Sequence, residues 1–294
     1  MAIVVITGSN SGFGLAAALA FARNGDTVVA TMRDPTRATT LREALAAEEL
    51  EADVRSLDVT KAGTFADFFS GVVRDHGRVD VLVNNAGILR PGALEDISEE
   101  ALRLTMETNA IAPLLLAKAV LPIMRKQEAG YIIMISSLSG IAGLPGDVAY
   151  TASKFALEGS TEALRHEIDR WGIKVALVLC GMYATGIFAA SKNKDELLPA
   201  GYPMNSVYRP FVVSRLAEIH ARLPEAFSPS VVGNLLVDVA NSDGSRLRWS
   251  ADPVAERVLA TMFAHSDAER DEFLRNVGGS DWWSDGELQP PEPK

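Results

Sequence analysis

The sequence has little of what several classes of protein require. Among its 294 residues it contains one cysteine, Cys180. A single cysteine cannot form an intramolecular disulfide, which favours a reducing compartment, so we expect the protein in the cytoplasm. The four histidines, at positions 76, 166, 220 and 265, are scattered without metal-ligand spacing, so we expect no metal site.

Basic charge and long apolar runs are also scarce. The chain has 28 Lys and Arg against 38 Asp and Glu, a formal net charge of −10, and such a surface repels nucleic-acid phosphates. The longest apolar run, residues 110–124, is interrupted by Lys118 and two prolines, and it predicts no membrane span. The N-terminal apolar run lacks a basic stretch before it and predicts a buried strand rather than a signal peptide.

What the sequence does have is an alternation of apolar runs and amphipathic segments. Strands are expected over residues 3–6, 27–31, 53–57, 79–83, 131–136, 174–179 and 247–250. Helices are expected over residues 12–23, 36–49, 61–75, 98–126, 151–170, 208–222, 230–239 and 252–263. The pattern predicts an α/β fold, a Rossmann-like doubly wound parallel sheet of about seven strands with helices on both faces.

The chain is expected to form a single catalytic domain over residues 1–278, followed by a C-terminal tail over residues 279–294. The alternation of strands and helices does not continue within residues 186–245, which are rich in proline and aromatic residues. This segment predicts a lid over a largely apolar substrate, with core packing of an enlarged C-terminal lobe as the alternative. The tail is acidic and rich in proline, and Trp282 and Trp283 are expected to order part of it.

A glycine-rich turn follows the first expected strand and opens the first expected helix. It runs from Thr7 to Gly14 with the pattern T-G-x-x-x-G-x-G. Glycines allow a tight turn, and the helix N-terminus presents N–H groups to a pyrophosphate. The turn therefore predicts dinucleotide binding, although such turns also occur for purely steric reasons.

Three further segments lie where a dinucleotide would be selected. Arg33 stands at the end of the second strand, where an arginine suits a 2′-phosphate, so NADP(H) is favoured. NAD(H) is the alternative if Asp34 turns inward instead. Asp58 and Val59 suit adenine recognition, although Asp58 could equally cap a helix. Asn84-Asn85-Ala86-Gly87 ends the fourth strand with small residues at the switch point of the sheet.

The reactive centre is predicted at Tyr150 and Lys154, which lie four residues apart and so share one helix face. A phenol has an ordinary pKa of about 10, too high for a base at neutral pH. A neighbouring ammonium favours the phenolate, and at about 4 Å the attraction is of order 4 kcal/mol. Ser137, thirteen residues before Tyr150 (150 − 137), closes the fifth strand beside them.

Together these motifs, over residues 1–185, resemble the short-chain dehydrogenase/reductase family, nearest its hydroxysteroid and retinol dehydrogenase branch. Asn109 matches the family's helix asparagine. The chain departs from the family pattern in two places, where Cys180-Gly181 replaces Pro-Gly and Phe13 replaces an isoleucine. The resemblance implies an enzyme that interconverts a secondary alcohol with a ketone or aldehyde.

The resemblance also implies a role for each site residue. Tyr150 exchanges a proton with the substrate oxygen, Ser137 orients that oxygen, and Lys154 lowers the Tyr150 pKa and holds the ribose. Asn109 continues a proton relay through a bulge and a water. The residues implied in cofactor binding are Gly8, Ser11, Gly12, Phe13, Gly14, Arg33, Asp58, Val59, Asn85, Ala86, Gly87, Tyr150, Lys154, Gly181, Met182 and Thr185.

The substrate pocket is expected around Ser137, Leu138, Leu144, Val148, Tyr150 and Tyr183, with Leu89, Ser139 and Met182 nearby. The partner is then a small carbonyl or alcohol. An apolar face expected on two helices, with Ile111, Leu114, Leu115, Phe155 and Leu164, indicates a homodimer or homotetramer. The competing functions are a lyase of the same fold and a nucleotide sensor without turnover, which usually lacks the tyrosine or the lysine that this chain retains.

Overall fold

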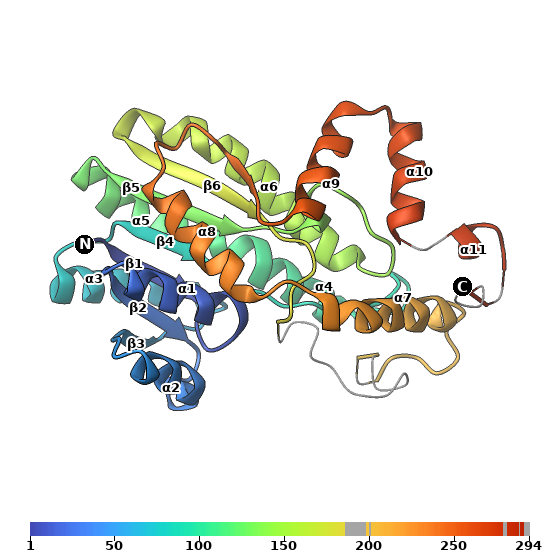
Figure 1. Ribbon diagram of the computed structural model, residues 1–294, viewed down its shortest axis with the longest axis horizontal. Helices are drawn as coiled ribbons and strands as arrows, with labels where there is room; N and C mark the ends of the chain where they lie inside the picture. The colour runs from blue at the N-terminus through green and yellow to red at the C-terminus, as the bar shows by residue number, and fades with distance from the viewer. Residues whose placement is uncertain (186–197, 200, 279–280, 288, 291–294) are drawn as a thin grey trace.

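The fold centres on one parallel sheet. A computed structural model describes residues 1–185, 198–199, 201–278, 281–287 and 289–290. In it seven strands lie in the order β3-β2-β1-β4-β5-β6-β7, all parallel (Figure 1). The strands are β1 Ile3–Thr7, β2 Thr27–Met32, β3 Asp53–Ser56, β4 Val81–Asn84, β5 Gly130–Ile135, β6 Ile173–Leu179 and β7 Arg248–Ser250. The predicted doubly wound sheet is confirmed, with its order reversing between β1 and β4.

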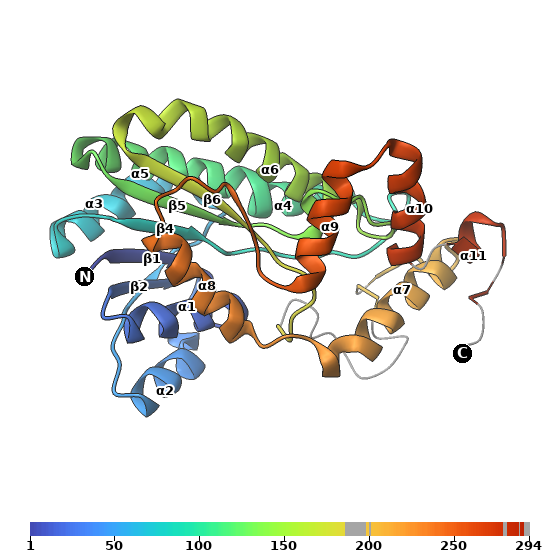
Figure 2. The same cartoon turned by 45° about the horizontal axis from the view of Figure 1, so that its top comes forward.

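Helices cover both faces of this sheet. They are α1 Gly12–Arg23, α2 Thr39–Ala47, α3 Phe65–His76, α4 Glu99–Met106, α5 Ala112–Gln127, α6 Val148–Ile168, α7 Arg209–Arg222, α8 Pro229–Asn241, α9 Pro253–Ala264, α10 Asp267–Gly278 and α11 Asp281–Ser284. Figure 2 shows α3, α5 and α6 on one face of the sheet, and α1, α2 and α8 on the other.

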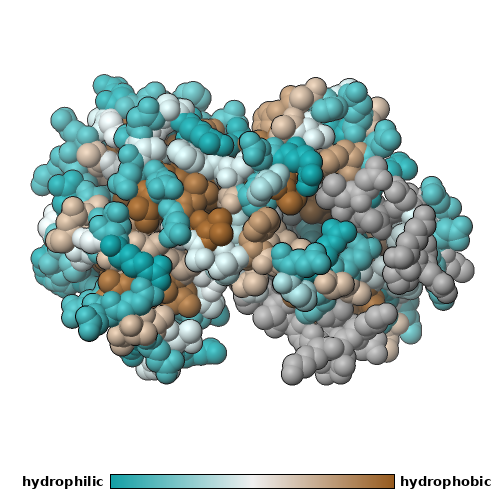
Figure 3. All heavy atoms as spheres, viewed as in Figure 1, coloured by the Kyte–Doolittle hydropathy of each residue, from teal (hydrophilic) through white to brown (hydrophobic). Residues whose placement is uncertain are grey.

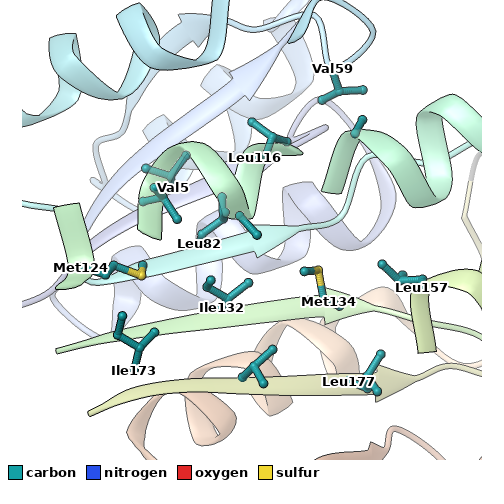
Figure 4. Close-up of a cluster of buried hydrophobic side chains, with 14 of the residues drawn as sticks. Val5, Val59, Leu82, Leu116, Met124, Ile132, Met134, Leu157, Ile173 and Leu177 are labelled. Atoms are coloured by element: carbon teal, nitrogen blue, oxygen red, sulfur yellow. The ribbon is translucent and has the colours of Figure 1, made fainter. Parts of the chain in front are cut away.

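Two hydrophobic cores follow from the alternation of side chains along each strand. On β1, Val5 joins the cluster beneath α3, α5 and α6, whereas Val4 and Ile6 join the cluster beneath α1 and α8. Figure 4 shows the first cluster, where Leu82 and Ile132 of neighbouring strands meet Leu116 of α5. The strands are buried on both faces, as their near-continuous apolar sequences indicate.

Helix α8 corrects the predicted extent of the substrate lid. The lid was expected to run to residue 245, but α8 packs along α1 against the sheet. A Cβ added at Gly233 would lie 2.6 Å from the Ala16 carbonyl oxygen, so the two helices approach too closely for any larger residue. Because its apolar stripe (Val232, Leu236, Val239) faces the sheet, α8 belongs to the nucleotide-binding layer rather than to a lid.

The long helix expected over residues 98–126 is interrupted. A π-helical turn over Glu107–Ile111 separates α4 from α5. By length and composition alone Glu99–Gln127 could cross a membrane, but half of its apolar window is buried inside the protein. Its apolar residues, Leu116 and Val120 among them, pack on the sheet as those of a core helix do.

A smaller lobe lies beyond the carboxyl ends of the strands, beside a narrower waist in Figure 3. Phe211 and Leu216 of α7 pack there with Tyr202 and Ala93. Trp282 and Trp283 join the same cluster, with the Trp283 ring 5.5 Å from that of Phe211. The tryptophans thus hold the start of the expected tail against α7. Part of the expected lid, residues 186–197 and 200, lies outside the described residues.

Candidate functional site

The ends of β1 and β4 are joined by the hydroxyl of Thr7. The Thr7 Oγ1 atom accepts hydrogen bonds from the backbone N–H groups of Asn85, at 2.9 Å, and Ala86, at 3.0 Å. The Asn85 side chain in turn donates to the carbonyl oxygens of Thr7 and Gly8. These bonds fix the two loops at the switch point of the sheet, where ligands of doubly wound folds bind. The sequence motif contains Thr7 but did not reveal this role.

The glycine-rich turn between β1 and α1 has the shape that a dinucleotide phosphate needs. Gly8 and Gly12 have positive φ angles of 71° and 55°. A Cβ on Gly14 would lie 2.2 Å from the Gly8 carbonyl oxygen, so only glycine fits there. Ser11 precedes α1 without a side-chain cap, which leaves the first N–H groups of the helix for an anion. The turn therefore fits the pyrophosphate of a dinucleotide.

The polar residues that follow β2 and β3 differ in how their side chains are engaged. Asp34 accepts hydrogen bonds from the Thr36 N–H and hydroxyl, which lower the pKa of its carboxyl group. Arg33 is exposed, and its side chain makes no hydrogen bond or ion pair in the described part of the chain. Asp58 accepts from the Thr60 N–H and hydroxyl, which closes a turn. The expected helix cap is wrong, because the 3₁₀ turn that follows begins only at Ala62, after Lys61. Of these groups, the Arg33 guanidinium is the one left to meet a ligand.

Asn109 is held rigidly in the π-helical turn. Its Oδ1 accepts from the Ile88 N–H at 2.8 Å, and its Nδ2 donates to the Ile88 carbonyl at 2.8 Å and to Ser153 Oγ at 3.1 Å. Ser153 then donates to the Tyr150 carbonyl at 2.7 Å. The bulge expected at Asn109 is therefore the π turn. Ser153, which links Asn109 to the helix that carries Tyr150, was not anticipated from the sequence.

Tyr150 and Ser137 come together at the carboxyl end of β5. Helix α6 begins at Val148, so Tyr150 lies in its first turn and is partly exposed. Burial of the phenol raises its pKa, and a hydrogen bond with the Ser137 side chain opposes that shift. A protonated phenol beside a serine hydroxyl can act as a proton donor to an oxygen placed between them.

Lys154 lies one helical turn after Tyr150, with its Nζ 5.7 Å from the centre of the Tyr150 ring. The ammonium group donates to the Ile135 carbonyl at 2.7 Å. Burial lowers the pKa of Lys154 to about 8, while nearby Cys180 and Glu158 oppose this. The expected lowering of the Tyr150 pKa by this ammonium stays a prediction, because the Lys154 charge is not among the causes that shift it here.

A buried carboxylate follows Lys154 on the same helix and pairs with a partly buried arginine. Glu158, one turn further along α6, accepts from Arg248 Nε of β7 at 2.9 Å. A Cβ added at Gly140 would lie 2.9 Å from the Glu158 side chain and 3.2 Å from the Lys154 carbonyl oxygen. Glu158 therefore packs directly under the loop that follows Ser137. No motif in the sequence marks this pair, because its partners lie 90 residues apart.

The segment after β6 brings one correction. Tyr183 was expected to line the substrate pocket, but its side chain is only 1% exposed and packs edge-on against Phe13. Its hydroxyl donates to the Ala251 carbonyl at 2.9 Å, so its polar end has a structural partner. Tyr183 is therefore a core residue. Gly181, expected at the cofactor, donates its N–H to Asp252 at 2.9 Å, and Thr185 lies against Gly12.

The other expected pocket residues surround the same edge of the sheet. Leu138 and Leu144 are partly buried, and Val148 is exposed at the start of α6. Ser139 is buried, with its N–H bonded to the Ser137 hydroxyl. Of these positions, Leu138, Leu144 and Val148 keep some exposed apolar surface. In the described residues no group of three or more His, Cys, Asp and Glu side chains is placed to hold a metal ion.

Known proteins are similar in sequence to this chain over most of its length. The family described as short chain dehydrogenase matches residues 2–196. An uncharacterised oxidoreductase of Bacillus subtilis, YusZ, is 35% identical over 90% of this chain and 92% of its own. A 3-ketodihydrosphingosine reductase of Bacteroides thetaiotaomicron is 41% identical over 66% of this chain and 68% of its own. Bovine retinol dehydrogenase 8 is 34% identical over 83% of this chain and 80% of its own. The last of these agrees with the predicted branch.

Solved structures extend the comparison. A short-chain dehydrogenase from Streptomyces avermitilis has a TM-score of 0.77 at 30% identity, over 95% of this chain and 98% of its own. A metagenomic short-chain oxidoreductase in complex with NADP has a TM-score of 0.65 at 26% identity, over 85% and 95%. A short-chain dehydrogenase/reductase from Burkholderia phymatum in complex with NAD shares the fold. It is 22% identical, with a TM-score of 0.75 over 100% of this chain and 97% of its own. The chain therefore belongs to the short-chain dehydrogenase/reductase family and is an oxidoreductase that uses a nicotinamide cofactor.

Proposed function

We propose that this oxidoreductase interconverts a secondary alcohol with a ketone or aldehyde. The observation that carries the proposal is the meeting of the Tyr150 and Ser137 side chains at the switch-point edge of the sheet, with Lys154 one helical turn away. A lyase of the same fold remains the competing reaction. Consumption of a reduced nicotinamide in the presence of a panel of ketones distinguishes the two reactions. It is measured by the near-ultraviolet absorbance of the cofactor.

In the proposed mechanism each residue acts on one atom. Ser137 donates a hydrogen bond to the substrate oxygen, and Tyr150 gives that oxygen its proton in reduction or takes it in oxidation. Lys154 holds positive charge near the phenol and reaches the ribose hydroxyls. Asn109, fixed by Ile88 and Ser153, continues a proton path through water. The bound cofactor supplies or accepts the hydride.

A largely apolar substrate fits the composition of the pocket wall. Leu138, Leu144 and Val148 are apolar, lie between Ser137 and Tyr150 in the chain, and keep part of their surface exposed. Two relatives are named for work on largely apolar molecules, a retinol and a 3-ketodihydrosphingosine. We also propose a cytoplasmic location, on the single buried cysteine.

Replacing Tyr150 with phenylalanine tests the mechanism. Tyr150→Phe removes the proton donor, and turnover should fall by about a hundredfold to ten-thousandfold, with cofactor affinity little changed. Steady-state kinetics and a cofactor titration measure the two effects. Tyr131→Phe, at the opposite end of β5, is the control and should keep its turnover. Near-normal turnover in Tyr150→Phe would contradict the proposal.

The buried charge of Lys154 predicts a dependence of stability on pH. Its pKa falls from 10.5 to about 8 in the folded protein, so between these values the unfolded chain binds more protons. The free energy of unfolding should therefore rise by about 3 kcal/mol between neutral pH and about pH 10 from this group alone. Lys154→Met should lack that rise, be more stable than the parent at neutral pH, and lose turnover.

Urea unfolding of the parent and of Lys154→Met at both pH values measures this difference. Lys126→Met, an exposed lysine in the last turn of α5, is the matched control and should follow the parent. If the free energy of unfolding changed equally with pH in the parent and in Lys154→Met, burial of the Lys154 ammonium would not destabilise the folded protein.

We propose NADP(H) as the preferred cofactor, because Arg33 is exposed and free to meet a 2′-phosphate while Asp34 is engaged by Thr36. Arg33→Ala should weaken NADPH binding by about tenfold or more, since a charge-assisted hydrogen bond is lost. NADH binding should stay the same. Fluorescence titration measures both, with Arg74→Ala of α3 as the control. An unchanged NADPH affinity in Arg33→Ala would favour NAD(H).

We propose a homodimer or homotetramer through the outer faces of α5 and α6. Ile111 and Phe155 are 41% and 45% exposed there, whereas Leu114, Leu115 and Leu164 are partly covered by their own fold. Burying such apolar side chains between copies is favourable. Light scattering at micromolar concentration should give a multiple of 31.5 kDa for the parent. Phe155→Glu should shift the protein towards the monomer, and a monomeric parent would contradict the proposal.

A further inference from the structure

The loop from Cys180 to Thr185, called the β6 loop below, touches both regions where a nicotinamide cofactor would bind. At its start, the Cys180 carbonyl accepts from the Leu138 N–H at 3.2 Å, directly after Ser137. At its end, Thr185 lies against the glycine-rich turn, where a Cβ added at Gly12 would be 3.3 Å from the Thr185 Cβ. A cofactor whose phosphates meet that turn and whose reactive ring meets Ser137 would therefore extend along the β6 loop.

Asp252 holds the start of the β6 loop from the neighbouring chain segment. Strand β7 pairs in parallel with the end of β6, and the same register continued places Asp252 opposite Gly181. The Asp252 Oδ2 atom accepts from the Gly181 N–H at 2.9 Å. A backbone carbonyl is the usual acceptor at such a step of a parallel ladder, but the Ala251 carbonyl accepts from the Tyr183 hydroxyl instead. The Asp252 side chain therefore takes the place of a backbone acceptor.

Asp252 is also the N-cap of helix α9, which Figure 1 shows beyond the carboxyl end of β6. Its Oδ1 atom accepts from the Ala255 N–H at 2.8 Å. A helix cap of this kind needs one acceptor oxygen, which serine supplies about as well as aspartate. The carboxylate therefore has a second oxygen beyond what the cap uses, and that oxygen holds the β6 loop.

The contact between Asp252 and Gly181 is close and buried. A Cβ added at Gly181 would lie 2.9 Å from Oδ1 and 3.0 Å from Oδ2 of Asp252, so a side chain there would displace the carboxylate. Asp252 is only 6% exposed and makes no ion pair in the part of the chain that the structure describes, so burial of its charge is unfavourable. A serine would cap α9 without burying a charge. The bond to Gly181 is what the carboxylate adds.

We propose that Asp252 is a positioning residue for the nicotinamide end of the cofactor, which it serves by fixing Gly181 at the start of the β6 loop. The fixed loop limits the orientations that the nicotinamide ring can take beside Ser137 and Tyr150, and transfer between two groups depends steeply on such positioning. The inference concerns cofactor binding and so goes beyond the proposed alcohol–ketone reaction. It rests on that reaction only where turnover is the readout.

Asp252→Ser separates the two hydrogen bonds, because serine keeps the cap of α9 and has no second oxygen for Gly181. The probes are NADPH and 2′-phospho-ADP-ribose, which lacks only the nicotinamide, or NADH and ADP-ribose if the protein prefers NAD(H). The dissociation constant of the whole cofactor should rise about tenfold, since the loosened loop must be ordered when the ring binds, and that of the fragment should stay within about twofold. Fluorescence titration, with competition for the fragment, measures both.

Turnover supplies a second readout. Asp252→Ser should lower kcat by about tenfold or more, because the reacting groups are held less closely in place. The deuterium isotope effect on kcat, with the cofactor deuterated at the transferred position, should rise, since hydride transfer then limits the rate more strongly. A general loss of folded protein would lower the rate without raising the isotope effect.

Two further variants separate cofactor positioning from stability. Ser98→Ala is the matched control for loss of a cap, since Ser98 accepts from the Ala101 N–H at the start of α4. It should lower the melting temperature and leave both dissociation constants unchanged. Gly181→Ala disturbs the same contact from the other side, and it should weaken binding of the whole cofactor as Asp252→Ser does. Asp252→Ser should itself melt close to the parent, because its cap is kept.

Two binding results would overturn the proposal. The first is an unchanged affinity for the whole cofactor in Asp252→Ser and Gly181→Ala. The second is an equal weakening of the cofactor and its fragment, which would indicate that Asp252 supports the fold alone. If Asp252→Ser does not fold, Gly181→Ala decides by the same comparison. A parent without turnover on any ketone or alcohol overturns the alcohol–ketone reaction and leaves this proposal standing, because the titrations need no substrate.

Discussion

The site depends on one series of hydrogen bonds that begins at Thr7. Its hydroxyl holds the loop after β4, and that loop holds Asn109 through the backbone of Ile88. Asn109 donates to Ser153, which donates to the Tyr150 carbonyl. The turn that fits the cofactor phosphates and the helix that carries the tyrosine are thereby held relative to each other. The Asn109–Ser153 bond is buried and the others are partly buried, which limits competition from water and keeps the spacing rigid.

This rigidity explains why unfavourable charge burial is tolerated beside the site. The Lys154 ammonium and the Glu158 carboxylate are both buried on α6, and each loses hydration. The Ile135 carbonyl and Arg248 compensate in part, and both belong to strands of the same sheet. A fold with a looser α6 would let water reach these groups and remove the desolvation that shifts the pKa of Lys154. The same desolvation therefore destabilises the folded protein and lowers the pKa of Lys154.

Much of the fold followed from the sequence, because local patterns specify local structure. The strand runs, the glycine-rich turn and the Tyr150–Lys154 spacing all depend on neighbours within a few residues, and those predictions agree with the structure. Helix α8 was assigned to the substrate lid because the sequence of an amphipathic segment does not indicate which surface that segment covers. Tyr183 was misassigned for the same reason, since an aromatic side chain suits a core as well as a pocket.

The pairings across the fold were beyond the reach of sequence patterns. Glu158 and Arg248 lie 90 residues apart, and nothing in either neighbourhood marks the other. The fold brings them together because β7, which carries Arg248, pairs with β6 at the edge of the sheet that α6 covers. In the small lobe, Phe211 packs against the loop at Gly146, and the cluster around Phe211 includes Trp282 and Trp283. The end of the chain therefore bears on the position of the loop that leads into α6. In this protein the sheet sets the position of the reacting groups, and the packing of the small lobe supports the loop that leads to Tyr150.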